Sequence, residues 1–177
     1  MTGKPPDALR LDHLPTPIGT ALLVTDEAGV LRAFDFEDFE GRMARLLRRH
    51  YGAANLEAGA APRAIKDPVL RYFDGDLHAL DEVAWATAGT MFQRSVWAAL
   101  TTIPAGETLS YGGLAGRIGK PKAARAAGLA TGANPVAIIV PCHRVIGADG
   151  SLTGYGGGLP RKQWLLDHEG ARLRRFN

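Results

Sequence analysis

The hydrophobic pattern of the first half of the chain predicts a mixed α/β structure. Residues 20–25 and 30–36 are short apolar stretches on either side of a polar turn sequence that ends in glycine, which is the pattern of a β-hairpin. Residues 38–51 place apolar side chains at helical spacing, and residues 64–73 predict a second, shorter helix in which proline marks a kink or the start. We expect a further strand over residues 80–85.

Two stretches of this half have no clear period. Residues 1–17 are rich in proline and are expected to form a loose lead-in, and residues 52–62 are small and polar and are expected to form a loop. No recognisable chemistry falls in this half, so we interpret residues 1–88 as one domain that serves as scaffold.

The pattern changes near residue 89, where short helices follow one another. Thr90 is suited to cap a helix over residues 91–102, and a last helix is expected over residues 161–169. Between them, Ser110 precedes a helix over residues 111–118, and another runs over residues 122–131. Two short helices joined by a tight, glycine-containing turn are typical of a helix-turn-helix, although such pairs are also common in ordinary cores.

The apolar run at residues 136–140 is short and β-branched, which predicts a buried strand that ends at Pro141. The only cysteine of the chain, Cys142, comes next and is followed by His143 and Arg144. A lone cysteine is most often an inert buried residue. Here, positively charged neighbours favour the thiolate, which is the reactive form, so we interpret Cys142 as a candidate nucleophile.

Charge is unevenly distributed along the 177 residues. Residues 1–89 carry 10 Lys and Arg against 14 Asp and Glu, whereas residues 90–177 carry 11 against 4. No acidic residue occurs between Thr108 and Ala148, although five basic residues do. An acid-free window around the candidate nucleophile favours an anionic partner such as nucleic acid. The arginines of residues 42–49 follow several acidic residues and are interpreted as a solvated helix face.

Several classes of protein are not expected from the composition. One cysteine allows no intrachain disulfide, the first ten residues lack the apolar segment of a secretory signal, and no apolar run has the length of a membrane span. We expect a cytoplasmic protein.

Two further stretches point to a ligand. Residues 122–131 form a helix of mostly small residues from which Arg125 projects, which suits a shallow minor groove as well as tight packing against another helix. Residues 152–158 hold four glycines around Tyr155, which predicts backbone close to a ligand beside one aromatic wall.

A series of short motifs in this half occurs in a recognisable order. The residues concerned are Phe92, Gln93, Val96 and Trp97; Ile103, Pro104, Gly106, Glu107 and Thr108; Ser110 and Tyr111; residues 123–126 with Gly128; Asn134 and Pro135; residues 141–146; and Gly154, Tyr155, Gly157 and Gly158. Over residues 89–170 the chain therefore resembles the O6-alkylguanine-DNA alkyltransferases, also called methylated-DNA–protein-cysteine methyltransferases.

The resemblance implies a fold and an activity. The fold is α/β (α+β), with a ribonuclease-H-like domain at residues 1–88 and a mainly helical DNA-binding and alkyl-transfer domain with a helix-turn-helix at residues 89–177. The activity is DNA repair by direct reversal, in which double-stranded DNA is bound in the minor groove and the alkylated guanine is flipped out. The O6-alkyl group, or less well an O4-alkyl group of thymine, then passes irreversibly to the protein in a single turnover. We expect no cofactor, no membrane partner, and a monomer whose cooperativity on DNA stays open.

The resemblance also implies catalytic roles for particular residues. Cys142 attacks the alkyl carbon, His143 takes its proton through a water, Glu169 orients the imidazole, and Asn134 braces the turn before the active-site strand. For Glu169, an ordinary surface residue near a helix end is the alternative.

The same comparison assigns the residues that bind DNA and the base. Those that bind DNA are Tyr111, Gly112, Lys120 and Arg125, of which Arg125 fills the space left by the flipped base. Those around the alkylguanine are Tyr111, Val145, Tyr155 and Gly156.

Some positions depart from the pattern of the family. Gly156 stands where some relatives have serine, and Thr131 and Gly132 are smaller or less basic than in some relatives, so a roomier pocket that tolerates bulkier alkyl groups is a hypothesis. Some relatives bind zinc in the N-terminal domain, but His13, His50 and His78 are scattered without cysteine nearby, so no metal is expected here.

Three other functions are alternatives to alkyl transfer. A cysteine hydrolase would use the same Cys-His-Glu set but would turn over repeatedly and would not need an acid-free helix pair. A non-catalytic binder of alkylated DNA would lack the cysteine, and a transcription regulator would need long polar side chains on its recognition helix to read base edges.

Overall fold

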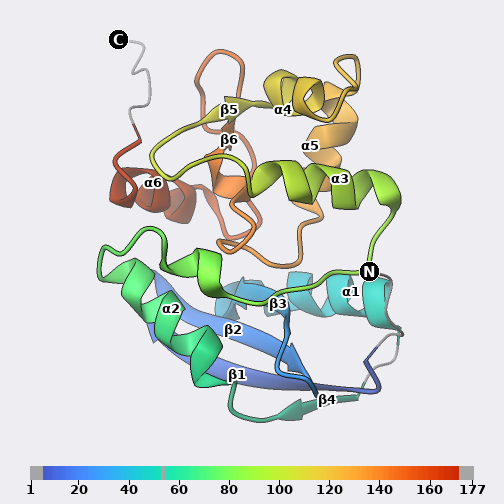
Figure 1. Cartoon of the computed structure of the whole chain (residues 1–177), viewed down its shortest axis with the longest axis vertical. Helices are drawn as coiled ribbons and strands as arrows, with labels where there is room; N and C mark the ends of the chain where they lie inside the picture. Colours follow the sequence, from blue (N-terminus) through green and yellow to red (C-terminus); the bar gives the residue numbers. More distant parts are fainter. Residues whose placement is uncertain (1–5, 53–54, 172–177) are drawn as a thin grey trace. The chain divides into compact units, whose positions relative to one another are not determined.

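The computed structural model describes residues 6–52 and 55–171, which form a mixed α/β structure (Figure 1). The chain divides into two compact units. The first consists of Met1–Gly89 and Pro135–Ile139, and the second of Thr90–Asn134 and Val140–Asn177. No helix in the described ranges is long and apolar enough to cross a membrane.

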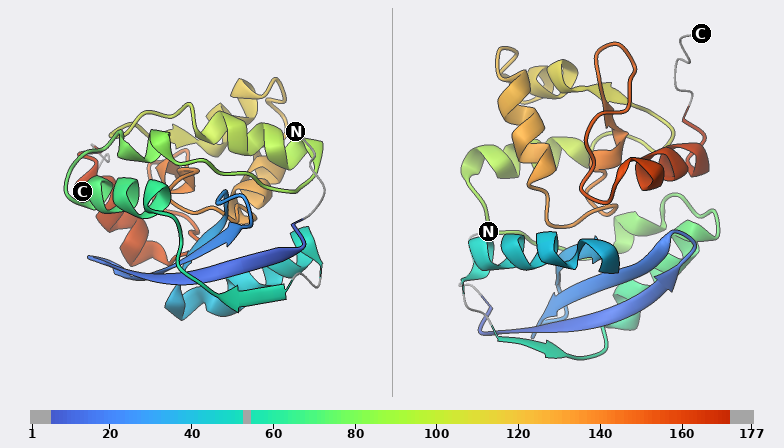
Figure 2. Two further views of the ribbon diagram at one scale, coloured as in Figure 1. Left: turned by 60° about the horizontal axis from the view of Figure 1, so that its bottom comes forward. Right: turned by 180° about the vertical axis from the view of Figure 1, so that it is seen from behind.

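A four-stranded sheet forms the centre of the first unit, in the order β3-β2-β1-β4. The predicted hairpin is confirmed, because β2 (Gly19–Asp26) pairs antiparallel with β3 (Leu31–Phe36). β1 (Ala8–Thr16) pairs antiparallel with β2 and parallel with β4 (Asn55–Ala58). The views in Figures 1 and 2 place helices α1 and α2 on opposite faces of this sheet.

Two predictions for this sheet are wrong. The expected lead-in contains β1, an inner strand of the sheet, and the expected loop contains β4; residues 1–5 and 53–54 lie outside the described ranges. The prolines obscured the apolar pattern of β1, in which Leu9 and Leu14 are buried. All four side chains of β4 are exposed, so only its backbone pairing with β1 defines it as a strand.

The two predicted helices of this unit are confirmed. α1 (Glu40–Tyr51) follows the 3₁₀ helix η1 (Glu37–Phe39) and packs three buried side chains, Met43, Leu47 and Tyr51, into a core with buried strand residues. α2 (Arg63–Phe73) contains Pro68 in its interior, so this proline does not start the helix. The strand expected over residues 80–85 is wrong, because Ala79–Glu82 form a 3₁₀ helix, η2, and only Trp85 makes a single bridge, to Leu31.

The segment Pro135–Ile139 packs with the first unit but is not the strand predicted over residues 136–140. It is bonded to Phe34, whose N–H donates to the Pro135 carbonyl at 2.9 Å and whose carbonyl accepts from the Ala137 N–H at 3.0 Å. The ladder goes no further because Ile138 has a φ of 67°, the only positive value at a non-glycine residue among the described ones. The apolar run is buried, as expected, but in consecutive turns rather than in a strand.

The second unit contains the four helices predicted for it. α3 (Met91–Leu100) begins with a capping box, in which Thr90 and Gln93 each bond the other's backbone N–H. α4 (Tyr111–Arg117) is capped by Ser110, whose hydroxyl accepts from the Gly113 N–H. α6 is Leu159–His168. α5 (Ala124–Gly132) starts two residues later than residue 122, because the Ala123 N–H bonds the Lys120 carbonyl in a preceding turn.

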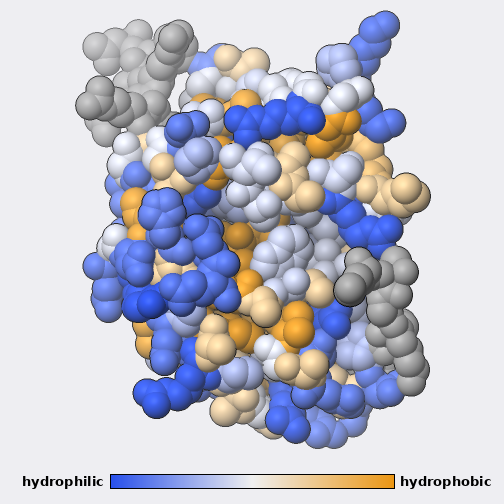
Figure 3. All heavy atoms as spheres, in the orientation of Figure 1, coloured by the Kyte–Doolittle hydropathy of each residue, from blue (hydrophilic) through white to orange (hydrophobic). Residues whose placement is uncertain are grey.

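The small residues of α5 serve tight packing on one side of that helix. Ala127 and Ala130 are buried, and the Ala130 carbonyl accepts a hydrogen bond of 2.9 Å from the indole of Trp97 in α3. On its other side, Arg125 and Leu129 are exposed, Leu129 by 72%. On the face drawn in Figure 3, apolar residues are interspersed among hydrophilic ones.

Short elements carry the motif around the cysteine. β5 (Leu109–Ser110) and β6 (Val145–Ile146) pair in parallel, and the 3₁₀ helix η3 (Cys142–Arg144) leads directly into β6. The nucleophile candidate therefore lies in a turn of helix that is held on one side by a short strand pair.

Candidate active site

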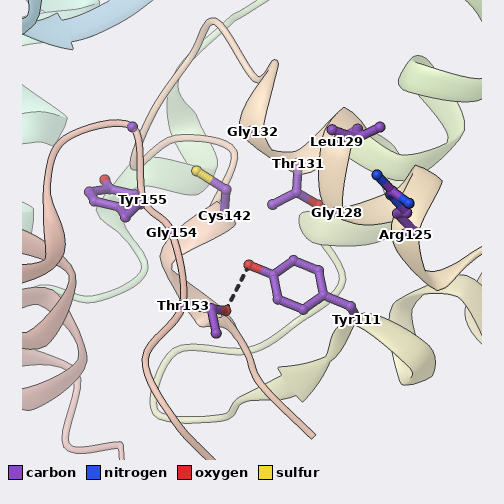
Figure 4. A pocket seen from close by; sticks show the side chains of 11 residues that line it. Tyr111, Arg125, Gly128, Leu129, Thr131, Gly132, Cys142, Thr153, Gly154 and Tyr155 are labelled. Carbon is purple, nitrogen blue, oxygen red and sulfur yellow. Dashed lines mark hydrogen bonds between the residues drawn. The ribbon is translucent and has the colours of Figure 1, made fainter.

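Cys142 is the first residue of η3 and is 6% exposed, yet its side chain lines a cavity of about 510 Å³. Its N–H bonds the Val140 carbonyl at 2.7 Å, which fixes the start of η3. The other lining residues are Tyr111 of α4; Arg125, Gly128, Leu129, Thr131 and Gly132 of α5; and Thr153, Gly154, Tyr155 and Gly156 of the glycine-rich loop. Figure 4 shows the sulfur between Tyr155 and Thr131, so a thiol that is almost buried still faces a space large enough for a small molecule or a base.

A fully buried imidazole follows the cysteine. The Nε2 atom of His143 lies 2.8 Å from Oε1 of Glu169, the C-cap residue of α6. A carboxylate only accepts hydrogen bonds, so Nε2 carries the hydrogen and the lone pair of the neutral ring is on Nδ1. Nδ1 is buried and has no hydrogen-bond partner among the described residues. The ring is therefore placed and oriented to accept a proton at Nδ1.

Arg144 holds the same carboxylate from the other side. Its Nε and terminal NH2 donate to the two oxygens of Glu169 at 2.9 and 2.8 Å, and its other terminal nitrogen donates to the Ile103 carbonyl. Arg144 is therefore more than the positive charge beside the thiol that the sequence indicates, because its guanidinium fixes the carboxylate of Glu169.

The environment sets the protonation of this pair. Burial lowers the pKa of His143, although the hydrogen bond and charge of Glu169 oppose that shift, so the imidazole is neutral near pH 7. Burial raises the pKa of Glu169, but the hydrogen bonds from His143 and Arg144 and the charge of Arg144 outweigh it and hold that pKa well below its usual range. A neutral imidazole next to a permanent carboxylate is a competent proton acceptor.

Asn134 lies behind the cysteine and is fully buried. Its side-chain NH2 donates to the Val140 carbonyl at 2.9 Å. These two residues flank the segment Pro135–Ile139, so the bond closes that segment at its base, and Val140 in turn accepts the hydrogen bond from the N–H of Cys142.

The walls of the cavity are connected to one another. The Thr153 hydroxyl donates to the Tyr111 hydroxyl at 3.2 Å, as Figure 4 shows, which links the glycine-rich loop to α4. The ring of Tyr155 meets the His143 imidazole edge to face, with centroids 6.4 Å apart. A Cβ at Gly128 would contact the ring of Tyr111 at 3.4 Å, so glycine in α5 lets this ring approach closely.

The structure brings together most, but not all, of the residues selected from the sequence. Tyr111, Arg125, Tyr155 and Gly156 line the cavity, and Asn134, His143 and Glu169 are buried behind it. Val145 is buried and is not among the lining residues, and its carbonyl accepts a hydrogen bond of 2.6 Å from Lys162 Nζ. Gly112 and Lys120 are exposed and lie outside the lining.

Lys162 is the residue that sequence reasoning missed completely. A lysine in the first turns of an amphipathic helix normally points to solvent, but Lys162 is fully buried in α6. Nothing in the sequence around it signals this burial.

Among residues 6–52 and 55–171, no group of three or more His, Cys, Asp or Glu side chains is placed to hold a metal ion. The three histidines singled out from the sequence are on separate elements, with His13 in β1, His50 in α1 and His78 just before η2.

Comparisons with known proteins agree with this geometry. Residues 91–171 match the family described as 6-O-methylguanine DNA methyltransferase, DNA binding domain. The methylated-DNA–protein-cysteine methyltransferase of Salmonella typhimurium is 49% identical over 164 residues, which cover 92% of this chain and 96% of the relative. The protein of the same name from Mycobacterium bovis is 58% identical over 131 residues, which cover 72% of this chain and 79% of the relative.

A solved structure shows the same similarity at the level of the fold. The crystal structure of Mycobacterium tuberculosis OGT in complex with DNA has a TM-score of 0.75 and 41% sequence identity, and the match covers 92% of each chain. Identity at this level over almost the full length of both proteins is independent of the single motif around Cys142. The chain belongs to the family of the methylated-DNA–protein-cysteine methyltransferases.

Proposed function

We propose that this protein repairs DNA by direct reversal, accepting the O6-alkyl group of a guanine in duplex DNA on Cys142 in one irreversible turnover. The observation that carries the proposal is the position of Cys142, whose side chain lines a cavity, while the next residue, His143, is buried, paired with Glu169 and in ring contact with Tyr155 of the cavity wall. The names of the relatives, which state methyl transfer from methylated DNA to a protein cysteine, support the same reaction.

The chemistry requires a thiolate and a protonated leaving group. His143 Nδ1 takes the thiol proton through a water, and the sulfur attacks the alkyl carbon while the bond from that carbon to O6 breaks. The electron pair of that bond stays on the purine, which takes up a proton from solvent while the imidazolium releases its proton to solvent, so that guanine leaves neutral and Cys142 becomes an S-alkyl thioether. Glu169 stays ionised, held by Arg144, and stabilises the imidazolium while it exists.

DNA binding is assigned to the surface around the mouth of the cavity. The pair α4 and α5, joined through Gly119 with its φ of 69°, acts as a helix-turn-helix in the minor groove. Arg125 and Leu129 project from the side of α5 that is exposed, so Arg125 is available to fill the space that a flipped base leaves. Gly112 and Lys120 are exposed on the same helix pair and are assigned to the phosphate backbone.

The flipped base is assigned to the cavity of about 510 Å³. Tyr111 and Tyr155 form its aromatic walls, and Gly156 offers backbone rather than a side chain. Thr131 and Gly132 add only small side chains to the lining, and the Thr131 hydroxyl is already bonded to the Ala127 carbonyl. These small residues support tolerance of O6-alkyl groups bulkier than methyl.

The finer architecture is part of the proposal. We assign residues 1–88 to a ribonuclease-H-like domain and residues 89–177 to the DNA-binding and alkyl-transfer domain. The monomeric state, the cytoplasmic location and the weaker action on O4-alkylthymine stay predictions.

The mass of the intact protein tests the function. After incubation with a duplex that holds one O6-methylguanine, we expect the protein to gain one methyl group, on Cys142, and the DNA to regain guanine. Cys142→Ser should gain nothing. A protein that stays unmodified while it converts many equivalents of an ester or amide substrate would instead be a cysteine hydrolase, and a protein that binds the duplex without either change would be a non-catalytic binder.

A further inference from the structure

Lys162 is a buried cation that the proposed chemistry does not yet use. Its side chain has 0% exposure, and burial lowers its pKa to about 8. Lysine is almost never fully buried unless its charge is compensated.

The ammonium joins two segments that flank the nucleophile. Nζ donates to the Val145 carbonyl at 2.6 Å and to the Thr153 carbonyl at 2.7 Å. Val145 begins β6, directly after η3, and Thr153 lines the cavity and bonds the Tyr111 hydroxyl. Lys162 thus connects the backbone next to Cys142 with the loop that forms the cavity wall.

The charges around Lys162 leave its ammonium without an acidic partner. Both of its hydrogen bonds go to carbonyls, and it forms no ion pair with any Asp or Glu of the described part of the chain. Glu169 is neutralised by Arg144, and the nearby His143 is neutral, its pKa lowered by burial and, to a smaller extent, by Lys162 itself. The group whose charge raises the pKa of Lys162 is Cys142 in its ionised form.

Electrostatic interaction between two groups is mutual. If the Cys142 thiolate favours the protonated lysine, the protonated lysine favours the thiolate by the same energy. With Glu169 and Arg144 cancelling and His143 neutral, the site carries one net positive charge while Cys142 is a thiol. Once the thiol proton has passed to His143, the attacking sulfur carries a negative charge that the ammonium of Lys162 can balance.

From these contacts we infer that Lys162 is a positioning residue for alkyl transfer, whose buried ammonium holds the cavity loop against β6 and provides the counter-charge for the Cys142 thiolate. This inference rests on the proposed function for its biological meaning, but its electrostatic part concerns the thiol alone. It can therefore be tested with a reagent that needs neither DNA nor base flipping.

The test measures the rate at which iodoacetamide alkylates Cys142 between pH 5 and 10 in the full-length protein. The variant is Lys162→Met, and the matched control is Lys66→Met, which also removes one lysine charge, from an ion pair with Asp12 in the first unit. For Lys162→Met we expect the rising limb of the pH profile to move up by about one unit, as loss of a nearby buried cation does to a thiol. Lys66→Met should follow the wild type.

Alkyl transfer from an O6-methylguanine duplex is measured on the same proteins. At pH 7.5 we expect Lys162→Met to react about tenfold more slowly, in proportion to the thiolate that it loses. Its affinity for undamaged duplex should equal that of the wild type, because a fully buried side chain does not contact DNA. If the iodoacetamide profile of folded Lys162→Met superimposes on that of the wild type, the inference is overturned, whether or not the protein transfers alkyl groups. If the wild type transfers none but the profile shifts, the proposed function fails and the role of Lys162 stands.

A second measurement covers a Lys162→Met protein that does not fold. The protein has five lysines, so selective ¹³Cε labelling allows the titration of Lys162 to be followed by NMR in the wild type and in Cys142→Ser. Without a thiolate nearby, the pKa of Lys162 in Cys142→Ser should fall below its wild-type value. An identical titration in the two proteins would show that the two charges do not interact and would overturn the inference.

Discussion

The substitution Glu169→Gln isolates the contribution of the buried carboxylate to both stability and chemistry. In the native site, Oε1 of Glu169 accepts from His143 Nε2 and from one Arg144 nitrogen, and Oε2 accepts from Arg144 Nε. Glutamine keeps the shape but offers only one oxygen. Its amide NH2 must therefore face a donor, either on Arg144 or on His143, and the guanidinium loses its counter-charge.

The loss of stability expected for Glu169→Gln follows from the burial of the Glu169–Arg144 ion pair. Glu169 and Arg144 are 5% and 8% exposed, so the guanidinium has little water with which to replace the carboxylate. Removal of one member of a buried ion pair costs about 3–5 kcal/mol. We expect the free energy of unfolding of Glu169→Gln, measured by chemical denaturation at pH 7, to be lower than that of the wild type by an amount in this range.

The pH dependence gives a second check on the same group. Because the pKa of Glu169 is depressed in the folded protein, the carboxylate contributes its full stabilisation above the unfolded value of about 4.3 and loses it as the pH falls towards the lower folded value. The part of the stability difference between the wild type and Glu169→Gln that comes from the carboxylate should therefore shrink as the pH falls below about 4.

Alkyl transfer by the folded variant should also slow. Loss of the carboxylate removes the group that fixes the His143 tautomer and stabilises its protonated form, and proton transfer by a positioned base contributes typically 10²–10⁴-fold. We expect a reduction of about 10²-fold in the single-turnover rate. The matched control is Asp26→Asn, which breaks a partly buried pair with Arg32 in the first unit and should leave the rate unchanged. A folded Glu169→Gln protein that transfers methyl groups at the wild-type rate would refute the proton relay.

Three further substitutions test other parts of the site. Asn134→Ala leaves the buried Val140 carbonyl without its side-chain donor and should cost about 1–3 kcal/mol in urea denaturation, together with a slower alkyl transfer, whereas equal stability would deny Asn134 a structural role. Arg125→Ala changes an exposed residue and should alter stability by less than about 0.5 kcal/mol, but it should slow repair of duplex DNA. Arg45→Ala, at an exposed position of α1, should change neither the stability nor the rate of repair. The buried His143 has a lowered pKa and resists protonation in the folded state only, so the wild type should lose stability as the pH falls below about 6.5. His143→Gln should remove this part of the acid-induced loss of stability, and an unchanged pH dependence would contradict this.

The sequence predicted correctly those helices and strands that are defined by residues within or next to the element itself. The capped helices α3 and α4 and the hairpin of β2 and β3 follow from cap residues, turn residues and periodicity, and the structure contains them. The failures have one physical origin. β1 and β4 are strands because of the partners they pair with, and the run at residues 136–140 is buried without a ladder, so in each case the deciding information lies on another segment.

The candidate site shows the same division. Cys142, His143 and Arg144 are adjacent in the sequence, and their chemistry was apparent from residue types alone. Glu169 and Asn134 were selected only because the chain resembles a family, since neither is marked by a local pattern.

Lys162 was predicted neither from the local sequence pattern nor from the resemblance to a family. Its sequence context is that of an exposed helix residue, and its importance depends on the burial of α6 and on two carbonyls, of Val145 and Thr153, that come from other segments. The charge of a site is a sum over residues that the fold brings together, so the cation that balances a thiolate need not be next to it in the chain. In this protein the adjacent cation, Arg144, is bound to Glu169, whereas the ammonium of Lys162 bonds two carbonyls and forms no ion pair with an acidic residue of the described part of the chain. The hydrogen-bond partners of the two cations, and not their distance from Cys142 along the chain, are therefore the reason for inferring that Lys162 balances the thiolate.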